Sequence, residues 1–450
     1  MGKPMRFLSG LCLLALVLFG SAGVEARYVG GEPKCPTCDD CPQCATTSYR
    51  DAASGSTLSY TEGNLSDGHS VGETVSSVFG PTLSFSAIYN SKQADGSQSR
   101  TNTVMGYGWT HSYNTLLFSQ RGHMFRLGPD GRVTKYALGT GGRFTVTPGY
   151  FETLVKNPDG SFTLRQKDGT TYRFAQVAGT PFFVEGPVWR LQSITDRNNN
   201  VTTFTYVAGM LTQVTDTYGR RLTFSYTGNL LTSVTDPLGR ITRFSYSAGT
   251  LVQITDPENK SVQYSYNVLA QIVRKVDKDG RVFTYQYNSA QKPVGITDGV
   301  GNRILSMTNP NNWTTDETVL ASNLLRQYVP STTSKTDGRG NVWRYQYDKN
   351  SHITKLTAPD GAITSYSYDP ATLRVASEID ANNRTTSYQY DTQGNLVKRT
   401  DPLGLVTTYN YEPTFNMMTS QTDANGRVTS YQYDARGNRV KETDPLLGVR

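Results

Sequence analysis

The amino-acid sequence predicts an all-β protein, in which an array of antiparallel β-hairpins follows a smaller β-rich segment. Two observations lead to this fold class. A motif of 20 to 22 residues recurs ten times within residues 191–450, and the 450 residues include 42 Gly and 28 Tyr but only 36% hydrophobic residues. A near-fixed period of this length is typical of repeat architectures. Abundant glycine and tyrosine suit short strands joined by tight turns.

The first residues have the order of a secretory signal. Lys3 and Arg6 precede an apolar stretch from Phe7 to Phe19, and small residues follow up to Ala26. This order of charged, apolar and small residues is that of a signal peptide, and the apolar stretch is too short to span a bilayer comfortably. We therefore assign residues 1–26 to a signal peptide. We expect an exported protein without a transmembrane segment, located in the periplasm, at the cell surface or outside the cell.

Residues 27–58 are interpreted as a cysteine-rich tether. Its run CPTCDDCPQC contains four evenly spaced cysteines, Cys35, Cys38, Cys41 and Cys44. An exported chain meets an environment in which disulfides persist, so we expect disulfides among these cysteines, with three connectivities open. A four-thiolate metal or iron–sulfur site is the alternative, although the spacing before the last cysteine departs from that of a ferredoxin motif.

Two further β-rich ranges precede the repeats. Residues 59–120 contain FGPTLSFSAIYNS and VMGYGWTHSYNTLL, whose aromatic residues alternate as expected for strands. In residues 121–190, the pairs Asp130-Gly131, Asp159-Gly160 and Asp168-Gly169 punctuate short alternating runs. These runs predict divergent hairpins of looser period.

The repeats occupy residues 191–450, with an insertion near 302–330. Each copy begins at a turn residue, which is Asp196, Asp216, Asp236, Asp256, Asp277, Asp337, Ala358, Asp380, Asp401 or Asp423. An aromatic residue follows eight positions later, and a second aromatic residue, always Tyr, follows ten positions later. These second tyrosines are Tyr206, Tyr226, Tyr246, Tyr266, Tyr287, Tyr347, Tyr368, Tyr390, Tyr411 and Tyr433.

The turn of each repeat has the chemistry of a hairpin turn. TDPLGR, residues 235–240, places Asp, Pro and Gly where a type I turn with a glycine bulge requires them. The glycine slot holds Gly in seven copies and Asn in three, the residues that best tolerate positive φ. After the turn, Thr242, Phe244 and Tyr246 fall on one face of a strand. One hairpin cannot bury that face alone, so we expect the repeats to stack into one sheet.

The rows of tyrosine and basic residues each have two interpretations. Cross-strand aromatic packing explains the tyrosines, and the alternative is that the ten second tyrosines form a ligand row for sugars or peptides. Six copies place a basic residue directly after the turn: Arg220, Arg240, Lys260, Arg281, Arg384 and Arg427. This row suits either a solvated edge that discourages aggregation or a contact with acidic polysaccharide.

The repeat TDPLGRITRFSYSAG resembles the RHS or YD repeat. The pair FGPTLSFSAIYNS and GYGWTHSYN resembles the segment that precedes such repeats in bacterial RHS proteins, so that the resemblance covers residues 60–450. It implies a strip of hairpins that spirals into a hollow β-shell, distantly similar to that of animal teneurins. In bacterial members the shell often encloses a C-terminal toxin, and teneurins use theirs in adhesion. The chain lacks the motif that closes such shells, so no self-cleaving residue can be transferred.

Neither catalysis nor nucleic-acid binding is expected. GHSVG, residues 68–72, matches the G-x-S-x-G nucleophile elbow, but its flanks lack the strand and helix that hold such a serine. We interpret it instead as a turn that enters the first strand of the β-rich segment. We therefore assign no catalytic residue and no cofactor, and we expect no enzyme activity. The net charge is +7, yet only 18% of residues are charged and no long basic run occurs, which argues against nucleic acid as a partner.

The sequence thus predicts an exported, non-enzymatic RHS/YD-repeat scaffold. It would form part of a β-shell that encloses or presents a partner such as a C-terminal toxin or effector. The expected partner is a protein cargo or a downstream continuation of the chain, because the last copy starts at Asp444 and its tyrosine pair would fall beyond Arg450. The alternative is a cell-surface carbohydrate-binding or adhesion module that uses the tyrosine and arginine rows on polysaccharide.

We expect the cysteine run to be oxidised in the exported protein. Mass spectrometry of non-reduced, alkylated protein should then find no free thiol at Cys35, Cys38, Cys41 or Cys44, and no bound metal. Stoichiometric zinc or iron would instead establish the four-thiolate site.

Overall fold

The computed structural model of the chain describes residues 48–50, 57–59, 64–75, 83–91, 94, 104–120, 122–129, 133–139, 144–146, 149–178, 187–289, 291–308, 313–315, 328–330, 332–348 and 352–445. For β1 to β3, β25 and β26, only the backbone is described. The expected signal peptide, residues 1–26, and the four cysteines of the tether lie outside the described residues.

The described chain consists of antiparallel strands in three sheets, of five, 30 and two strands, without an α-helix. The all-β fold class expected from the sequence is therefore confirmed. The first sheet contains β1 (Ser48–Arg50), β2 (Thr57–Ser59), β3 (Asn64–Val75), β4 (Leu83–Asn90) and β5 (Trp109–His111). The smallest sheet pairs β25 (Trp313–Thr315) with β26 (Tyr328–Pro330).

The large sheet begins before the repeats. Its first strands are β6 (Leu116–Gln120), β7 (His123–Leu127), β8 (Val133–Leu138), β9 (Phe144–Val146), β10 (Thr153–Lys156), β11 (Phe162–Arg165), β12 (Thr171–Gln176) and β13 (Val188–Thr195). From β10 onward, each strand pairs with the next one in the sequence of the large sheet. Strands β6 to β9 pair among themselves and join the same sheet because β6 pairs with residues 188–190 of β13. Strand β13 is thus a branch point, since one of its edges holds both β6 and β14.

The repeats supply the rest of the large sheet. Up to the insertion these strands are β14 (Val201–Val207), β15 (Met210–Thr215), β16 (Arg221–Thr227), β17 (Leu230–Thr235), β18 (Ile241–Ser247), β19 (Thr250–Thr255), β20 (Ser261–Tyr266), β21 (Ile272–Val276), β22 (Val282–Tyr287), β23 (Pro293–Asp298) and β24 (Arg303–Thr308). Strand β24 pairs directly with β27, so the sheet passes the insertion without a break, and β25 and β26 form a separate hairpin.

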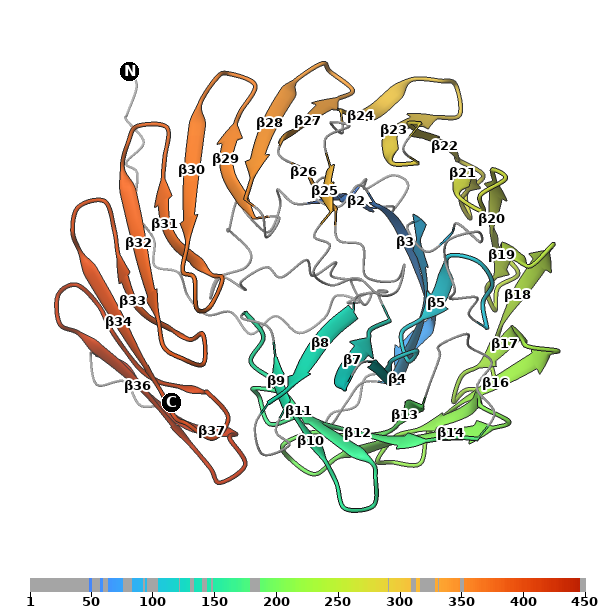
Figure 1. Cartoon of the computed structure of the whole chain (residues 1–450), viewed down its shortest axis with the longest axis horizontal. Coiled ribbons are helices and arrows are strands. Elements are labelled where there is room, and N and C mark those ends of the chain that lie inside the picture. Colours follow the sequence, from blue (N-terminus) through green and yellow to red (C-terminus); the bar gives the residue numbers. More distant parts are fainter. Residues whose placement is uncertain are drawn as a thin grey trace, which may run out of the picture.

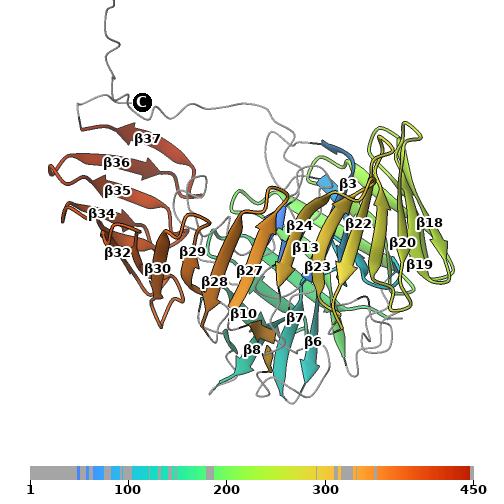
Figure 2. The same ribbon diagram turned by 90° about the horizontal axis from the view of Figure 1, so that it is seen from above.

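After the insertion the strands are β27 (Thr332–Asp337), β28 (Val342–Tyr347), β29 (Ile353–Thr357), β30 (Ile363–Tyr368), β31 (Val375–Ile379), β32 (Thr385–Tyr390), β33 (Leu396–Thr400), β34 (Val406–Tyr411), β35 (Met418–Thr422), β36 (Val428–Tyr433) and β37 (Arg439–Thr443). The strip of strands curves into a ring, with the first sheet on its inner side (Figure 1). Seen from above, β34 to β37 are turned relative to β18 to β24, so the strip twists as it curves (Figure 2). The sheet is not closed by strand pairing.

The aspartate that starts nine of the ten repeats holds its turn, and Ala358 starts the other. In the turn from Asp236 to Arg240, the amide of Gly239 donates to the carbonyl oxygen of Asp236 at 2.9 Å. Oδ1 of Asp236 accepts the amides of Leu238 and Arg240 at 2.9 and 3.0 Å. Gly239 has a φ of +80°. These contacts confirm the type I turn with its glycine bulge that the sequence predicted.

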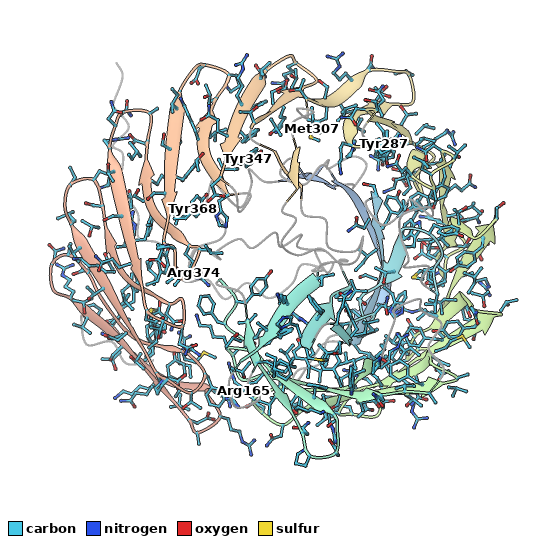
Figure 3. All side chains as sticks on the ribbon, in the orientation of Figure 1. Arg165, Tyr287, Met307, Tyr347, Tyr368 and Arg374 are labelled. Carbon is cyan, nitrogen blue, oxygen red and sulfur yellow. The ribbon has the colours of Figure 1, made fainter. Side chains whose placement is uncertain are left out.

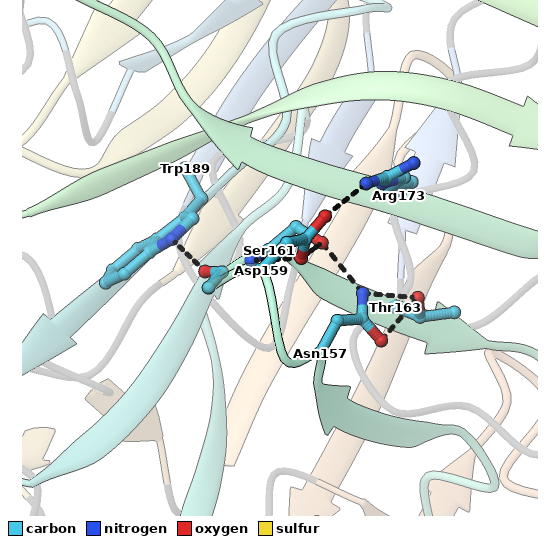
Figure 4. Close-up of polar contacts among 7 residues, drawn as sticks. Asn157, Asp159, Ser161, Thr163, Arg173 and Trp189 are labelled. Atoms are coloured by element: carbon cyan, nitrogen blue, oxygen red, sulfur yellow. Dashed lines mark hydrogen bonds and ion pairs between the residues drawn. The ribbon is translucent and has the colours of Figure 1, made fainter.

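A different set of side chains fixes the turn between β10 and β11. Oδ1 of Asp159 accepts the amide of Ser161 at 3.0 Å and its hydroxyl at 2.5 Å. Arg173 donates to Oδ2 of Asp159 at 2.5 Å, and Nε1 of Trp189 donates to the carbonyl oxygen of Gly160 at 3.0 Å. The turn is thereby tied to both β12 and β13 (Figure 4), which anchors the first hairpin of the series to the branch point.

Replacement of Gly239 by valine should destabilise its hairpin by about 1–3 kcal/mol, because a β-branched residue is strained at positive φ. Leu238→Val is the matched control, since this side chain in the same turn is 70% exposed and surface changes usually stay within about 0.5 kcal/mol. Denaturant midpoints and hydrogen exchange in β17 and β18 measure both. Equal losses in the two variants would contradict the turn assignment.

Candidate binding surface

Alternate residues of the repeat strands form the inner wall of the ring. In β18, Thr242 and Phe244 are buried and Tyr246 is half-buried, while the residues between them are exposed. Tyr347 and Tyr368 of later repeats lie on the same inner side (Figure 3). The two-residue period of a strand therefore brings the whole tyrosine ladder to one surface.

The first sheet covers one half of this wall. Phe85 of β4 packs edge-on against Phe224 and Phe244, with ring centroids 5.5 and 6.2 Å apart. Trp109 of β5 packs against Tyr264 at 5.0 Å, and its Nε1 donates to the hydroxyl of Tyr266 at 2.8 Å. Edge-to-face aromatic pairs contribute about 0.5–1.5 kcal/mol beyond their buried area. This half of the wall forms part of the buried core.

Backbone groups of the repeats also bond to the segment that they cover. The amide of Leu231 donates to the carbonyl oxygen of Val104 at 2.8 Å. The amide of Ile272 donates to the hydroxyl of Tyr89 at 3.1 Å. The inner wall therefore already holds one stretch of polypeptide, through both ring packing and hydrogen bonds.

The aromatic residues become more accessible toward the other half of the wall. Phe204 is 5% and Tyr285 4% exposed, and the corresponding Tyr388, Tyr409 and Tyr431 are half-buried. The contacts of the first sheet reach Ile272 of β21 and Tyr287 of β22, through Tyr89. Strand β30 lies further along the large sheet. We call the inner faces of β30 to β37 the late wall.

The residues opposite these aromatics change along the ring in parallel. Phe204, Phe224 and Phe244 lie directly across from Val214, Val234 and Ile254 on the neighbouring strand. In the late wall the pairs are Tyr366 with Glu378, Tyr388 with Arg399, Tyr409 with Gln421, and Tyr431 with Glu442. Opposite residues of an antiparallel pair lie on the same face. The wall thus begins with apolar pairs and ends with tyrosines next to charged or amide groups, and Tyr264 opposite Lys275 is an earlier pair of the second kind.

The second tyrosines have a structural role that sequence reasoning missed. At all ten of them the register shifts by one residue, which marks a β-bulge on the partner strand. Seven donate their hydroxyl to the carbonyl oxygen of the residue 15 positions earlier, in the preceding repeat. They are Tyr226, Tyr246, Tyr266, Tyr287, Tyr368, Tyr390 and Tyr433. We call this bond the tyrosine clamp.

The clamp explains why the second position holds tyrosine and never phenylalanine. Tyr246, for example, donates to Leu231 at 2.6 Å, so its ring can pack inward while its hydroxyl satisfies a backbone carbonyl. Burial raises the pKa of the Tyr246 hydroxyl above its ordinary value, which keeps this donor protonated. The spacing of the sequence contained the signal, because the two partners lie five residues before and ten residues after the start of the same turn, as Leu231 and Tyr246 do around Asp236. A ligand role of the row stays a prediction.

Most of the basic row is paired within its own turns. The guanidinium groups of Arg220, Arg240, Arg281 and Arg384 donate from Nε to the leading aspartate of the same turn, at 2.6 to 2.8 Å. Lys260 and Arg427 donate their backbone amides to that aspartate. The row therefore takes part in turn formation, and its contact with polysaccharide stays a prediction.

A small polar cavity lies under the first sheet, lined among others by His111, Asn114, Arg190, Tyr206 and Tyr226. Arg190 donates to Oδ1 of Asn114 at 3.5 Å, and both His111 and Arg190 are almost fully buried. Burial, and to a lesser extent Arg190, lowers the pKa of His111 to about 3. The imidazole is therefore neutral at ordinary pH, and it stacks on the ring of Phe85 with ring centroids 5.4 Å apart.

The remaining sequence motifs contribute no described side-chain site. Residues 68–72, the GHSVG stretch, lie within strand β3 rather than at the turn expected from the sequence, and only their backbone is described. Among the described residues, no group of three His, Cys, Asp or Glu side chains is arranged to hold a metal ion. The same part of the chain contains no helix of the length and apolarity needed to cross a membrane.

Comparison with protein families assigns the array. The RHS Repeat family model matches residues 190–221, 224–261, 332–363, 368–406, 390–419 and 414–446. The chain is an RHS-repeat protein. The family recognised in the sequence is thereby confirmed. No curated protein matches the chain.

Several solved structures align with the chain at low sequence identity. The crystal structure of TcdB2-TccC3-Cdc42 is 10% identical over 82% of this chain and 23% of that chain, with a TM-score of 0.38. The Tc holotoxin pore from Photorhabdus luminescens is 13% identical over 72% and 22%, with a TM-score of 0.30. The N-terminal domain of the effector protein SpvB from Salmonella typhimurium strain LT2 is 12% identical over 71% and 99%, with a TM-score of 0.23.

This RHS-repeat chain thus aligns with less than a quarter of the length of the two toxin structures. All three TM-scores lie below 0.5, so the architecture rests on the strand registers of the chain itself.

Tyr390→Phe should lower the stability of its repeat by about 1 kcal/mol, because it removes the clamp to the carbonyl oxygen of Val375, 2.8 Å away. Tyr411→Phe in the next repeat is the control, since no clamp from Tyr411 is present in the described structure. Hydrogen exchange of the amides of β31 should accelerate in the first variant only. An equal response of both repeats would refute the clamp.

Proposed function

We propose that this RHS-repeat protein is an exported, non-enzymatic scaffold whose ring encloses or presents a protein partner on the late wall. The observation that supports this proposal is the division of the inner wall. The half under the first sheet carries phenylalanines paired with valine and isoleucine, and the late wall carries the half-buried Tyr388 and Tyr431 beside Arg399 and Glu442. Aromatic residues next to mixed charges suit contact with a surface that stays hydrated.

A polypeptide is the partner favoured by the chemistry of the ring. The same wall binds a stretch of this chain's own polypeptide, through the contacts of Phe85 and Trp109 and the backbone bond from Leu231 to Val104. The late wall continues that interface along the sheet with the same tyrosine spacing. Its charges alternate in sign, which favours a partner that also carries charges of both signs.

Carbohydrate binding is the second candidate. It is favoured by the half-buried rings of Tyr388, Tyr409 and Tyr431, each next to a polar residue. A sugar face packs on an aromatic ring in the same way as an apolar side chain. The arginines of the turns give it less support, because four of them already bond to aspartates.

Binding of an unfolded polypeptide to the full chain tests the first candidate. Fluorescently labelled, reduced and carboxymethylated α-lactalbumin is a suitable probe, and its anisotropy should rise saturably with the concentration of the chain. The double variant Tyr388→Ser, Tyr409→Ser should weaken binding at least about tenfold, the equivalent of about 1.4 kcal/mol.

Gln389→Ser with Asn410→Ser is the matched control, since these neighbours are exposed on the opposite face of the same strands. Unchanged binding in the tyrosine variant, or no saturable binding at all, would contradict the proposal. Saturable binding of glycans that disappears in the tyrosine variant alone would favour the second candidate.

A further inference from the structure

Two turns far apart in the sequence meet where the ring comes round on itself. Phe415 lies in the turn between β34 and β35, and it packs against Gly169 between β11 and β12 and against Gly437 between β36 and β37. A β-carbon on Gly169 or Gly437 would come within 2.6 or 2.8 Å of the Phe415 ring. Both positions must therefore lack a side chain for Phe415 to lie there.

Polar side chains join the same two edges. We call the contact the seam; it is formed by residues 149–169 and 197–198 on one edge and by residues 372–374, 394, 414–417 and 437–438 on the other. Its bonds run from Asn416 Nδ2 to the carbonyl oxygen of Lys167 (3.0 Å), from Arg165 to that of Thr414 (3.4 Å), from Asn438 Nδ2 to Asn198 Oδ1 (2.9 Å) and from Arg197 to the sulfur of Met417 (3.8 Å). In Figure 1 the last hairpin, β36 and β37, comes round to the side of the ring that holds β10 and β11.

The turn that carries Phe415 is built to present it. Glu412 occupies the position of a turn aspartate, and its Oε1 accepts the amides of Phe415 and Met417 at 2.8 and 2.9 Å. Its Oε2 accepts the amide of Thr414 at 2.7 Å. The hydrogen bonds of Glu412 therefore fix the conformation of this turn without help from other strands. The ring of Phe415 points from the turn toward Gly169 on the opposite edge of the seam.

The seam differs in kind from the ladder that joins successive strands. Every hydrogen bond given above for the seam uses a side chain, and no strand pairing crosses it in the described structure. Neighbouring repeat strands, in contrast, pair over three to five residues in each register, as in β16 with β17. A curved array whose repeats contact only their neighbours bends by small changes shared over many repeats. Separation at the seam thus leaves the ladder intact.

Like charges oppose closure at one end of the seam. The side-chain nitrogen of Lys167 and the guanidinium of Arg374 lie 5.5 and 5.3 Å from the centre of the Phe151 ring. Burial and then Arg374 lower the pKa of Lys167 to about 8, with Asp391 as the opposing charge. The closed seam therefore disfavours the charged form of a lysine that an open seam would leave in water.

We propose that the seam is a latch, at which the ring opens and closes while its hairpins stay folded. Phe415 is the side chain that closes it, Gly169 and Gly437 are its seat, and Lys167 weakens it. The latch is a property of the chain alone and holds whether or not the ring encloses a partner.

Hydrogen exchange on the full chain tests the latch. Phe415→Ser should accelerate exchange about tenfold in both turns of the seam, residues 166–170 and 412–417, and should increase the radius of gyration measured by X-ray scattering. Exchange in β16 to β19 should not change. The exchange rate of residues 166–170 is the decisive measurement. These residues lie about 250 positions from the substitution, so only contact across the seam can transmit its effect to them.

Two further variants complete the test. Leu403→Ser removes a side chain that is 84% exposed in a turn outside the seam, and it should leave both turns and the radius unchanged. Lys167→Met removes the disfavoured charge and should slow exchange in residues 412–417. The latch is refuted if Phe415→Ser affects only its own turn, if exchange rises throughout the ring, or if Lys167→Met accelerates exchange in residues 412–417.

Discussion

The ring depends on the β-bulge that every repeat contains and on the tyrosine clamp that seven of the ten repeats form there. The bulge inserts one residue into the partner strand, which bends the sheet and increases its twist. It also turns a backbone carbonyl, such as that of Leu231, toward the following repeat, where the hydroxyl of Tyr246 reaches it. The same local irregularity therefore produces the curvature of the strip and supplies the bond that ties one repeat to the next. Without the bulge, a stack of hairpins would give a twisted open sheet.

Much of this architecture was accessible from the sequence, because its determinants are local. The turn from Asp236 to Arg240 requires only residues within five positions, and alternation along β18 places Phe244 and Tyr246 on one face. The division of the wall is also visible in the sequence. The first aromatic residue of the repeat is Phe in the early copies and Tyr in the late ones, and the Val or Ile opposite it is replaced in the late wall by Glu, Arg or Gln. The sequence did not show, however, that the early half of the wall is the half covered by the first sheet.

The parts that escaped sequence reasoning join residues that no period relates. Val104 bonds to Leu231, and Phe415 packs on Gly169, across separations set only by the curvature of the ring. The turn around Glu412 did carry a local sign, because it replaces the usual Asp and adds a residue before the strand resumes. A break in a regular pattern shows that something differs at that turn, but not which residue it meets.

The seam also places a limit on how the array can vary. Repeat arrays commonly gain or lose whole units, because each unit contacts only its neighbours. In this ring, Phe415 must arrive opposite Gly169, and adding or removing one hairpin between them would shift it by about 10 Å, the width of two strands. The number of repeats between the two edges is therefore fixed by geometry, although the sequence of each is free to drift. The residues within a repeat can therefore change, whereas the number of repeats between the two edges of the seam cannot.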